Sequence, residues 1–410
     1  MQKLEDSLFK TQLVLLILIN PLFIFGGFLP GLFLVIFSFI YLLIIFKNKL
    51  SFDITNKYSI IFLTFNFILI ISSFFSEHIL LSFEYSLLYF RYGIFALGIS
   101  YLFISRPKYL NYFLFSIIIF TLFVGLDALI QFITGNNLLN FPYDPHYRRL
   151  SGIFKDEQIL GLFLFKLTPF ILIYFHLSHK ENLFFNFRYL TTIFALFFLV
   201  TLSGERVSLV IFILFFLFYI IFSKKFFKQN LFLLVILSII FSISFISKPD
   251  LYKRIIFETY DQITSPNEYS DITIYSPGHT KHYLTAYEIF KDNPILEGGP
   301  KTFRILCKNY SYEGCSTHPH NFTMQLLSEV GMIGLLFFFF MYVSLLYMTL
   351  KIRPKTKKDF TKEYFLILSL AILMIYFPFI PSNNFFHQWI NIQNFVIFGL
   401  LLYVYKSKKI

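Results

Sequence analysis

Long apolar runs are the feature that most constrains what this chain can fold into. A helix crosses the hydrocarbon core of a bilayer with about 20 mostly apolar residues, because it rises about 1.5 Å per residue. Lipid admits only helices or closed barrels, and the runs found here lack the alternation of barrel strands. We therefore expect an all-α polytopic membrane protein of about 12 transmembrane helices. The candidate spans lie near residues 12–29, 31–46, 58–75, 83–104, 110–133, 158–177, 189–203, 205–222, 231–247, 322–350, 364–378 and 389–405.

The composition excludes a soluble enzyme. Hydrophobic residues make up 57% of the 410 residues and charged residues 14%, whereas soluble globular chains have roughly 45–50% and about 25%. The 2 cysteines are too few for a disulfide scaffold, and 61 Phe with 27 Tyr argue against disorder. The first run has no small-residue cleavage site and continues past Pro30 into the second. It is therefore expected to be a retained helix and not a cleaved signal peptide.

The net charge of +12 could suggest nucleic acid, but its placement indicates membrane topology instead. If the N-terminus is cytoplasmic and the spans alternate, most of the basic residues fall on the cytoplasmic side, with dense groups at 351–362 and 406–409. The short outside loops 76–82 and 379–388 contain no lysine or arginine. This asymmetry follows the positive-inside rule. We expect both termini in the cytoplasm and no nucleic-acid partner.

One long segment, 248–321, separates the spans. The chain is thus expected to divide into transmembrane helices 1–9 over 1–247, an outside loop over 248–321, and transmembrane helices 10–12 over 322–410. The loop is mostly polar, has a helical pattern around 281–291, and would form a lid over the outer mouth of the bundle. Its two cysteines, Cys307 and Cys315, would either pair in an oxidising compartment or remain free thiols.

Three of the ionisable residues inside predicted spans are considered first, because a charge there is costly and is usually paired or functional. Arg91 lies in the fourth span, Asp127 in the fifth and Lys166 in the sixth. Asp127 shares a helix face with Gln131, four residues further on. Arg91 and Asp127 could form a pair that only joins two helices, or they could belong to a site. Lys166 could be structural or could extend toward the surface.

A tight turn at 203–206, Ser-Gly-Glu-Arg, joins two spans on the outside. Its last residue, Arg206, places a guanidinium at the outer membrane surface. Such a group can contact a phosphate with two parallel hydrogen bonds. Taken alone, it could equally be an arginine that extends to the lipid interface.

The richest polar cluster, Thr-His-Pro-His-Asn at 317–321, leads directly into the span at 322–350. A metal needs three or four ligands, and no carboxylate stands at a suitable spacing, so we expect no metal here. The pKa of a histidine lies near neutrality, which makes His318 or His320 a candidate for a general base or for stabilising charge. Asn321 is expected to cap the following helix.

These segments resemble bacterial O-antigen ligases. His320, Asn321, nine residues, Gly331, two residues and Gly334 fit the signature H-[NSQ]-x9-G-x2-[GTY]. The wider O-antigen ligase/polymerase family has three further elements that this chain matches in order. They are RLSGIFKDEQILG at 149–161, SGERVSLV at 203–210 and YEIFKDNPILEGGPKTF at 287–303. The likeness extends over roughly residues 145–350 and includes the layout of twelve spans.

One position departs from the family pattern. The family usually has an arginine just before the lid helix, four residues ahead of an aromatic residue. Here His279 stands at that spacing from Tyr283, with Lys281 and His282 beside it. Either His279 or Lys281 would have to supply the second phosphate contact.

The resemblance implies a glycosyltransferase without cofactor that moves a glycan from undecaprenyl pyrophosphate to lipid A–core. It implies the periplasmic face of the bacterial inner membrane as the place of reaction. His320 would be the catalytic base, and the transfer would invert the anomeric configuration. The substrate-binding candidates are Arg206, His279, Lys281, Arg149, Arg91, His318 and Asn321.

Three alternatives remain open. A polymerase of the same family would use a second lipid-linked repeat unit as acceptor, and a protein O-oligosaccharyltransferase would use a protein. A lipid-linked glycan transporter would show related halves with interrupted helices at the midplane, and the sequence has no evident symmetry of that kind.

Overall fold

A computed structural model of the chain describes residues 2–48, 57–143, 149–155, 157–178, 187–223, 235, 239, 252–264, 275–292, 294–296, 298–310, 312, 314–352, 354 and 360–407. Within these residues the structure is all-helical, and the one extended pairing is an isolated bridge between Asn136 and Pro142. The prediction of an all-α fold is confirmed for the described part of the chain.

The helices follow the apolar runs. The first group is α1 (Gln2–Leu22), α2 (Phe28–Lys47), α3 (Lys57–Phe74), α4 (Ile79–Ser86), α5 (Phe90–Ser105), α6 (Lys108–Thr134), α7 (Leu160–Ser178), α8 (Phe187–Leu202) and α9 (Arg206–Phe222). The second is α12 (Glu258–Thr264), α13 (Pro277–Asp292), α14 (Phe303–Leu306), α15 (Phe322–Ile352), α16 (Phe360–Ile375) and α17 (Gln388–Ser407). Short turns are η1 (Phe23–Phe25), η3 (Gly152–Phe154), η4 (Lys253–Phe257) and η5 (Cys307–Asn309).

Among the described residues, 7 helical stretches are long and apolar enough to cross a membrane, and α8 and α9 are shorter apolar helices. The chain is therefore a polytopic membrane protein. Every predicted span except 231–247 coincides with a helix, and 231–247 lies outside the described residues apart from Val235 and Ile239. The full count of about 12 spans stays a prediction.

Two predicted spans are interrupted. The predicted span 83–104 falls within Ile79–Ser105, which is long and apolar enough to cross a membrane, but it is interrupted because α4 ends at Ser86 and α5 begins at Phe90. Asn66 Nδ2 donates to the Ser86 carbonyl at 2.7 Å, so a side chain of α3 satisfies that helix end. The second interruption lies inside α15 at Gly331, whose φ of 73° is left-handed. There the amides of Met332 and Ile333 donate to the carbonyls of Pro294 and Ile295.

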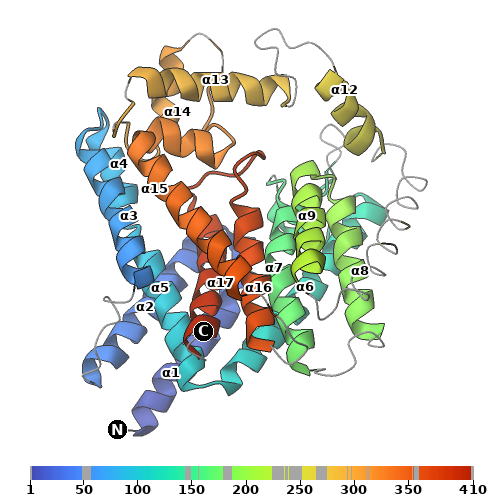
Figure 1. Cartoon of the computed structure of the whole chain (residues 1–410). Coiled ribbons are helices and arrows are strands. Elements are labelled where there is room, and N and C mark those ends of the chain that lie inside the picture. Colours follow the sequence, from blue (N-terminus) through green and yellow to red (C-terminus); the bar gives the residue numbers. More distant parts are fainter. Residues whose placement is uncertain are drawn as a thin grey trace.

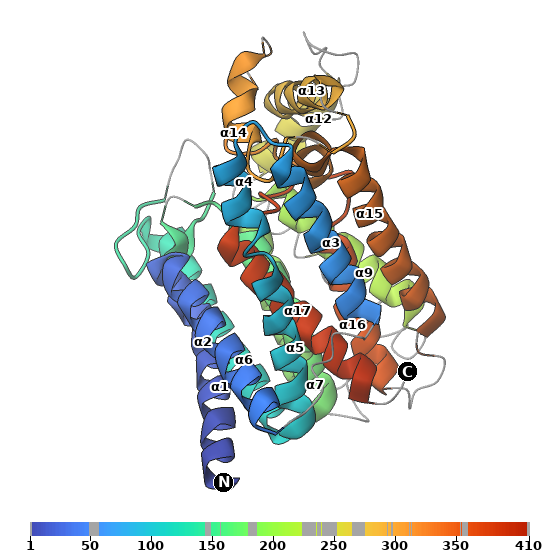
Figure 2. The ribbon, with the colours of Figure 1, turned by 90° about the vertical axis from the view of Figure 1, so that its left-hand side faces the viewer.

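The described helices form a bundle with its outer segments gathered at one end. α13 and α14 lie across that end, and the N-terminus lies at the opposite end (Figure 1). In the second view α1 and α2 form one side of the bundle and α15 the other (Figure 2). α5 packs against α17 near the centre, and α7 packs against α6, α8, α9 and α16. α7 is thus largely enclosed by protein, since 83% of the residues in its apolar stretch Leu160–Leu177 are buried.

Candidate functional site

His320 lies in a tight turn at the outer end of α15. Its φ of 55° is left-handed, which is uncommon for a residue with a side chain. Directly after it, Asn321 Oδ1 accepts from the Met324 amide at 3.1 Å. Asn321 is therefore the N-cap of α15, as predicted. Its Nδ2 donates to the carbonyls of Pro378 and Ile380 at 3.1 and 3.0 Å.

The segment between α16 and α17 fixes the backbone of this turn. The Ser382 amide donates to the His320 carbonyl at 2.8 Å. In return, Ser382 Oγ accepts from the Phe322 amide at 2.7 Å. Both backbone groups that flank the α15 N-terminus are thus satisfied, so the His320 ring is held by a rigid backbone.

Four histidines, which we call the histidine cluster, surround the turn. The ring of His320 lies 4.2 Å from His318, 5.0 Å from His282 and 5.9 Å from His279, measured between ring centroids. His279 and His282 come from α13, three residues apart and thus on one face. His279 Nδ1 is hydrogen-bonded to Ser276 Oγ at 2.7 Å, and His282 Nδ1 donates to the Gly314 carbonyl at 2.8 Å.

The disulfide beside this cluster confirms one of the two readings of the cysteines. Cys307 and Cys315 are bonded to each other. Since Gly314 accepts the hydrogen bond of His282, the disulfide fixes a segment that contacts the cluster. Across the described residues, no group of three or more His, Cys, Asp or Glu side chains is arranged to hold a metal ion.

Burial keeps His279, His318 and His320 unprotonated at neutral pH. It lowers the pKa of His320 to about 4, and the charge of His282 adds to this effect. Burial also lowers the pKa of His318 to about 3, with a contribution from His320. The pKa of His279 falls to about 4 through burial, then through His320 and His282, and then through Arg206 and Arg149. A neutral ring has a nitrogen lone pair that can accept a proton.

Two of the predicted cations, Arg206 and Arg149, lie close enough to the cluster to lower the pKa of His279. Arg206 is the first residue of α9, and its Nη1 donates to Thr259 Oγ1 at 3.1 Å and Gln262 Oε1 at 2.9 Å in α12. Arg149 lies beside the turn before α9, because the Leu150 amide donates to the Ser203 carbonyl at 3.2 Å. A further cation that the sequence analysis missed, Arg254, donates from Nε to the Gly204 carbonyl at 2.9 Å.

Asp127 and Gln131 support the segment that carries Arg149. Asp127 accepts from the Leu138 amide at 3.0 Å and from Asn137 Nδ2 at 3.2 Å. Gln131 Oε1 accepts from the Gly152 amide at 2.8 Å. The considered pair between Arg91 and Asp127 is therefore wrong: Asp127 bonds to its own outer loop. The face shared by Asp127 and Gln131 anchors that loop against α6.

Arg91, one of the predicted substrate contacts, has no described contact with the histidine cluster. Arg91 lies at the start of α5, donates from Nη2 to the Tyr92 hydroxyl at 3.2 Å and stacks over that ring. No described contact joins its side chain to the histidines or to Arg206. In α13 the rings that lie against His320 are those of His279 and His282. Of the two predicted substitutes for the family arginine, His279 has a ring contact with His320.

Two buried carboxylates that the sequence analysis overlooked hold the outer segments. Glu205 accepts from the amides of Gly161 and Leu162 at 2.6 and 3.1 Å, and so caps α7. Glu329 accepts from the amides of Lys301 and Phe303 at 2.9 and 3.2 Å. An acidic residue directly beside each recognised motif was the available signal.

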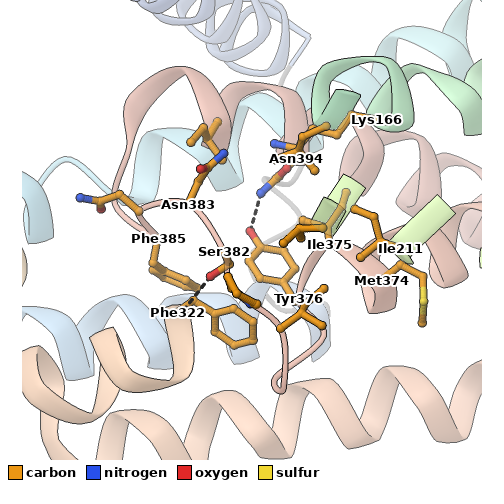
Figure 3. A pocket seen from close by; sticks show the side chains of 16 residues that line it. Lys166, Ile211, Phe322, Met374, Ile375, Tyr376, Ser382, Asn383, Phe385 and Asn394 are labelled. Carbon is orange, nitrogen blue, oxygen red and sulfur yellow. Dashed lines mark hydrogen bonds between the residues drawn. The ribbon is translucent and has the colours of Figure 1, made fainter. Parts of the chain in front are cut away.

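Two cavities lie below the turn. The inner cavity is small, about 50 Å³, and Asn384 is among the residues that line it. Lys166, Ser382 and Asn394 also line it (Figure 3). The lateral groove is larger, about 1160 Å³, and runs among apolar side chains of α3, α5, α15, α16 and α17. Tyr376 and Phe385 line both cavities.

Comparison with known proteins finds a match for one part of the chain. No curated protein matches the chain. Residues 191–339 match a family model described as O-antigen ligase. The matched range begins in α8, ends in α15 and contains Arg206, His279 and His320. The chain is thus a multi-pass membrane protein, of which roughly a third is similar to O-antigen ligases.

Proposed function

We propose that the protein transfers a glycan from undecaprenyl pyrophosphate to lipid A–core, as an O-antigen ligase. The observation that carries this proposal is the geometry around His320. An unprotonated imidazole stands on a rigid left-handed turn, and two arginines lie within electrostatic reach of the adjoining His279. A base beside fixed cations suits a reaction in which a hydroxyl attacks and a pyrophosphate leaves.

In the proposed reaction His320 accepts the proton of the acceptor hydroxyl. The hydroxyl oxygen forms a bond to the anomeric carbon from the face opposite the pyrophosphate, so the configuration inverts. The bond from that carbon to the pyrophosphate oxygen breaks, and the electron pair stays on the oxygen. Arg206 and Arg149, together with His279 as a hydrogen-bond donor, stabilise the charge that develops there. No resident metal is required by this scheme.

Donor binding would also activate the base. In the free protein, burial and the charge of His282 lower the pKa of His320 to about 4. A pyrophosphate placed beside the ring brings negative charge, which favours the protonated form and raises the pKa. His320 would then be a stronger base when the donor is bound than when the site is empty.

The lateral groove supports a polyprenyl donor. It is lined almost wholly by apolar and aromatic side chains and reaches the inner cavity at Tyr376 and Phe385. Its other end lies at Lys57, Tyr58 and Tyr405. We propose that the isoprenoid chain occupies this groove while the pyrophosphate remains below the histidine cluster.

The proposed orientation places the histidine cluster in the periplasm and both termini in the cytoplasm, within the bacterial inner membrane. Figure 1 is consistent with this, because α13 and the N-terminus lie at opposite ends of the bundle. In this arrangement 1–247 and 322–410 form the transmembrane bundle, and 248–321 is the periplasmic lid that contributes His279, His318 and His320.

Deletion of the gene tests the proposal. We expect loss of all long-chain lipopolysaccharide, with polymeric lipid-linked glycan accumulating, and rescue by the wild-type gene. Core that carries one repeat unit would indicate the polymerase instead. An unchanged lipopolysaccharide with loss of glycan from a secreted protein would indicate the protein O-oligosaccharyltransferase. Loss of lipid-linked glycan from the periplasmic leaflet would indicate a transporter.

A further inference from the structure

Lys166 is a buried cation that the proposed reaction does not yet use. It lies in the second turn of α7, about 9 Å along the axis from the helix start at 1.5 Å per residue. Its side chain is 2% exposed, so it does not extend to the surface. Among the described residues, Nζ has no hydrogen-bond partner. A buried ammonium is costly unless it is paired.

The inner cavity supplies the space for a partner. Lys166 lines it together with Asn384 and Asn394 (Figure 3). Asn384 Nδ2 is a second buried donor that has no partner in the described part of the chain. Asn394 Nδ2 donates to the Tyr376 hydroxyl at 2.8 Å. Since no carboxylate lines the cavity, its unused donors suit an anion with several oxygens.

The inner cavity lies next to residues that the proposed reaction uses. Ser382, which lines it, donates from its amide to the His320 carbonyl. Val207, directly after Arg206, lines its other side. The cavity thus lies between the turn that carries His320 and the start of α9, and Lys166 approaches this space from within the bundle.

We propose that the inner cavity binds the pyrophosphate of the polyprenyl carrier, with Lys166 as its counter-charge. This inference rests on the proposed function. When the bond from the anomeric carbon to the pyrophosphate oxygen breaks, the electron pair stays on that oxygen and the acceptor proton moves to His320. The carrier then has one more negative charge than before. Lys166 stabilises this charge from the membrane side, while Arg206 and Arg149 act from the outer side.

The test uses the full chain in lipid nanodiscs and the variant Lys166→Met, which keeps the length of the side chain and removes its charge. Lys155→Met is the matched control, since Lys155 is exposed on the outer face. Binding of undecaprenyl pyrophosphate and of inorganic pyrophosphate is titrated, and melting temperatures are recorded with and without each probe.

We expect Lys166→Met to bind undecaprenyl pyrophosphate about tenfold more weakly or worse, because a charge-assisted contact is lost. Without ligand its melting temperature should equal or exceed that of the wild type, since an unpaired buried charge is removed. Lys155→Met should behave as the wild type in both respects. Weakened binding that appears with inorganic pyrophosphate and not with the lipid would overturn the assignment to the carrier.

Failure of the proposal for Lys166 and failure of the proposed function would give different results. If the wild type binds the carrier and transfers glycan but Lys166→Met binds it equally well, the role of Lys166 is overturned and the proposed function stands. A lower melting temperature of the variant with unchanged affinity would likewise overturn it and indicate a structural lysine. If the wild type neither binds the carrier nor transfers glycan, the proposed function itself fails.

Discussion

Two acidic and two basic side chains that are buried toward the outer end of the bundle differ in their hydrogen bonding. Glu205 and Glu329 each accept three hydrogen bonds, two from backbone amides and one from Ser208 or Gln325. By contrast, Lys166 Nζ and His318 Nε2 are buried and have no hydrogen-bond partner among the described residues. The two carboxylates satisfy backbone amides, whereas Lys166 and His318 each have a nitrogen that could still bind a ligand.

This difference has a physical reason. A carboxylate can satisfy several orphan amides at a helix start or a loop, and each such bond is charge-assisted. A phosphate needs the reverse, a set of donors and cations that no protein carboxylate occupies. Placing the acids on the backbone therefore keeps them away from the site, which holds neutral imidazoles and cations ready for an anionic substrate.

His320→Ala should have the largest effect on catalysis. Loss of a general base reduces the rate by about 10²- to 10⁴-fold. The variant should remain in the membrane at the wild-type level, because the turn is fixed through its backbone. Transfer is measured with purified donor and acceptor, alongside His78→Ala as a histidine variant outside the cluster. Normal transfer by His320→Ala would refute the catalytic assignment.

Arg206→Ala should follow, with a loss of about 10²-fold in transfer if its charge stabilises the leaving group. Arg206→Lys should recover only part of it, because an ammonium lacks the planar pair of donors. Arg206 also bonds to Gln262, so Gln262→Leu tests whether it serves only to hold α12. If Gln262→Leu loses as much transfer as Arg206→Ala, the phosphate contact is refuted.

Glu329→Ala tests the scaffold side of the comparison. It leaves the amides of Lys301 and Phe303 without their acceptor, which should lower stability by about 2–4 kcal/mol. The melting temperature and the amount in the membrane should fall, while transfer per folded molecule changes little. Glu288→Ala removes a carboxylate that pairs with the exposed Lys291 and should lower stability much less, because solvent screens such a pair. Equal effects of the two variants would contradict a special role for Glu329.

The sequence predicts the spans well because a transmembrane helix is a local property of about 20 residues. It also predicts the N-cap at Asn321, since that residue lies in a compact motif. The roles of Arg206 and His320 stay predictions. Helix interruptions at glycine are harder to predict from the sequence. Gly331 interrupts α15 because the segment 294–296 packs against the helix at that point.

Contacts between segments that are far apart in the sequence were also not predicted, because they depend on the tertiary structure. His279 and His282 contact His320 because α13 lies across the end of the bundle. A pair between Asp127 and Arg91 was one of two alternatives, but the donors to Asp127 come from the loop that follows its own helix. Lys166 could not be assigned, because its lack of a partner is a property of the folded cavity.

The smallest expected effect is a difference between two pH profiles. Because the pKa of His320 is about 4 in the free protein, the acid limb of kcat/KM should lie near pH 4. Protonation removes the base, so activity falls as the pH falls through that value. The acid limb of kcat, which reports the donor complex, should lie at higher pH, because the bound pyrophosphate raises the pKa of His320.

Stability changes over a separate window and serves as the control for these profiles. The histidines titrate near 6.5 when unfolded, and burial lowers the folded pKa of His318 to about 3 and of His320 to about 4. Between these values the unfolded chain binds more protons, so stability is full above about pH 6.5 and declines as the pH falls toward 4. Melting temperatures must therefore be recorded at each pH. If kcat and kcat/KM have the same acid limb after correction for unfolding, donor binding does not activate His320.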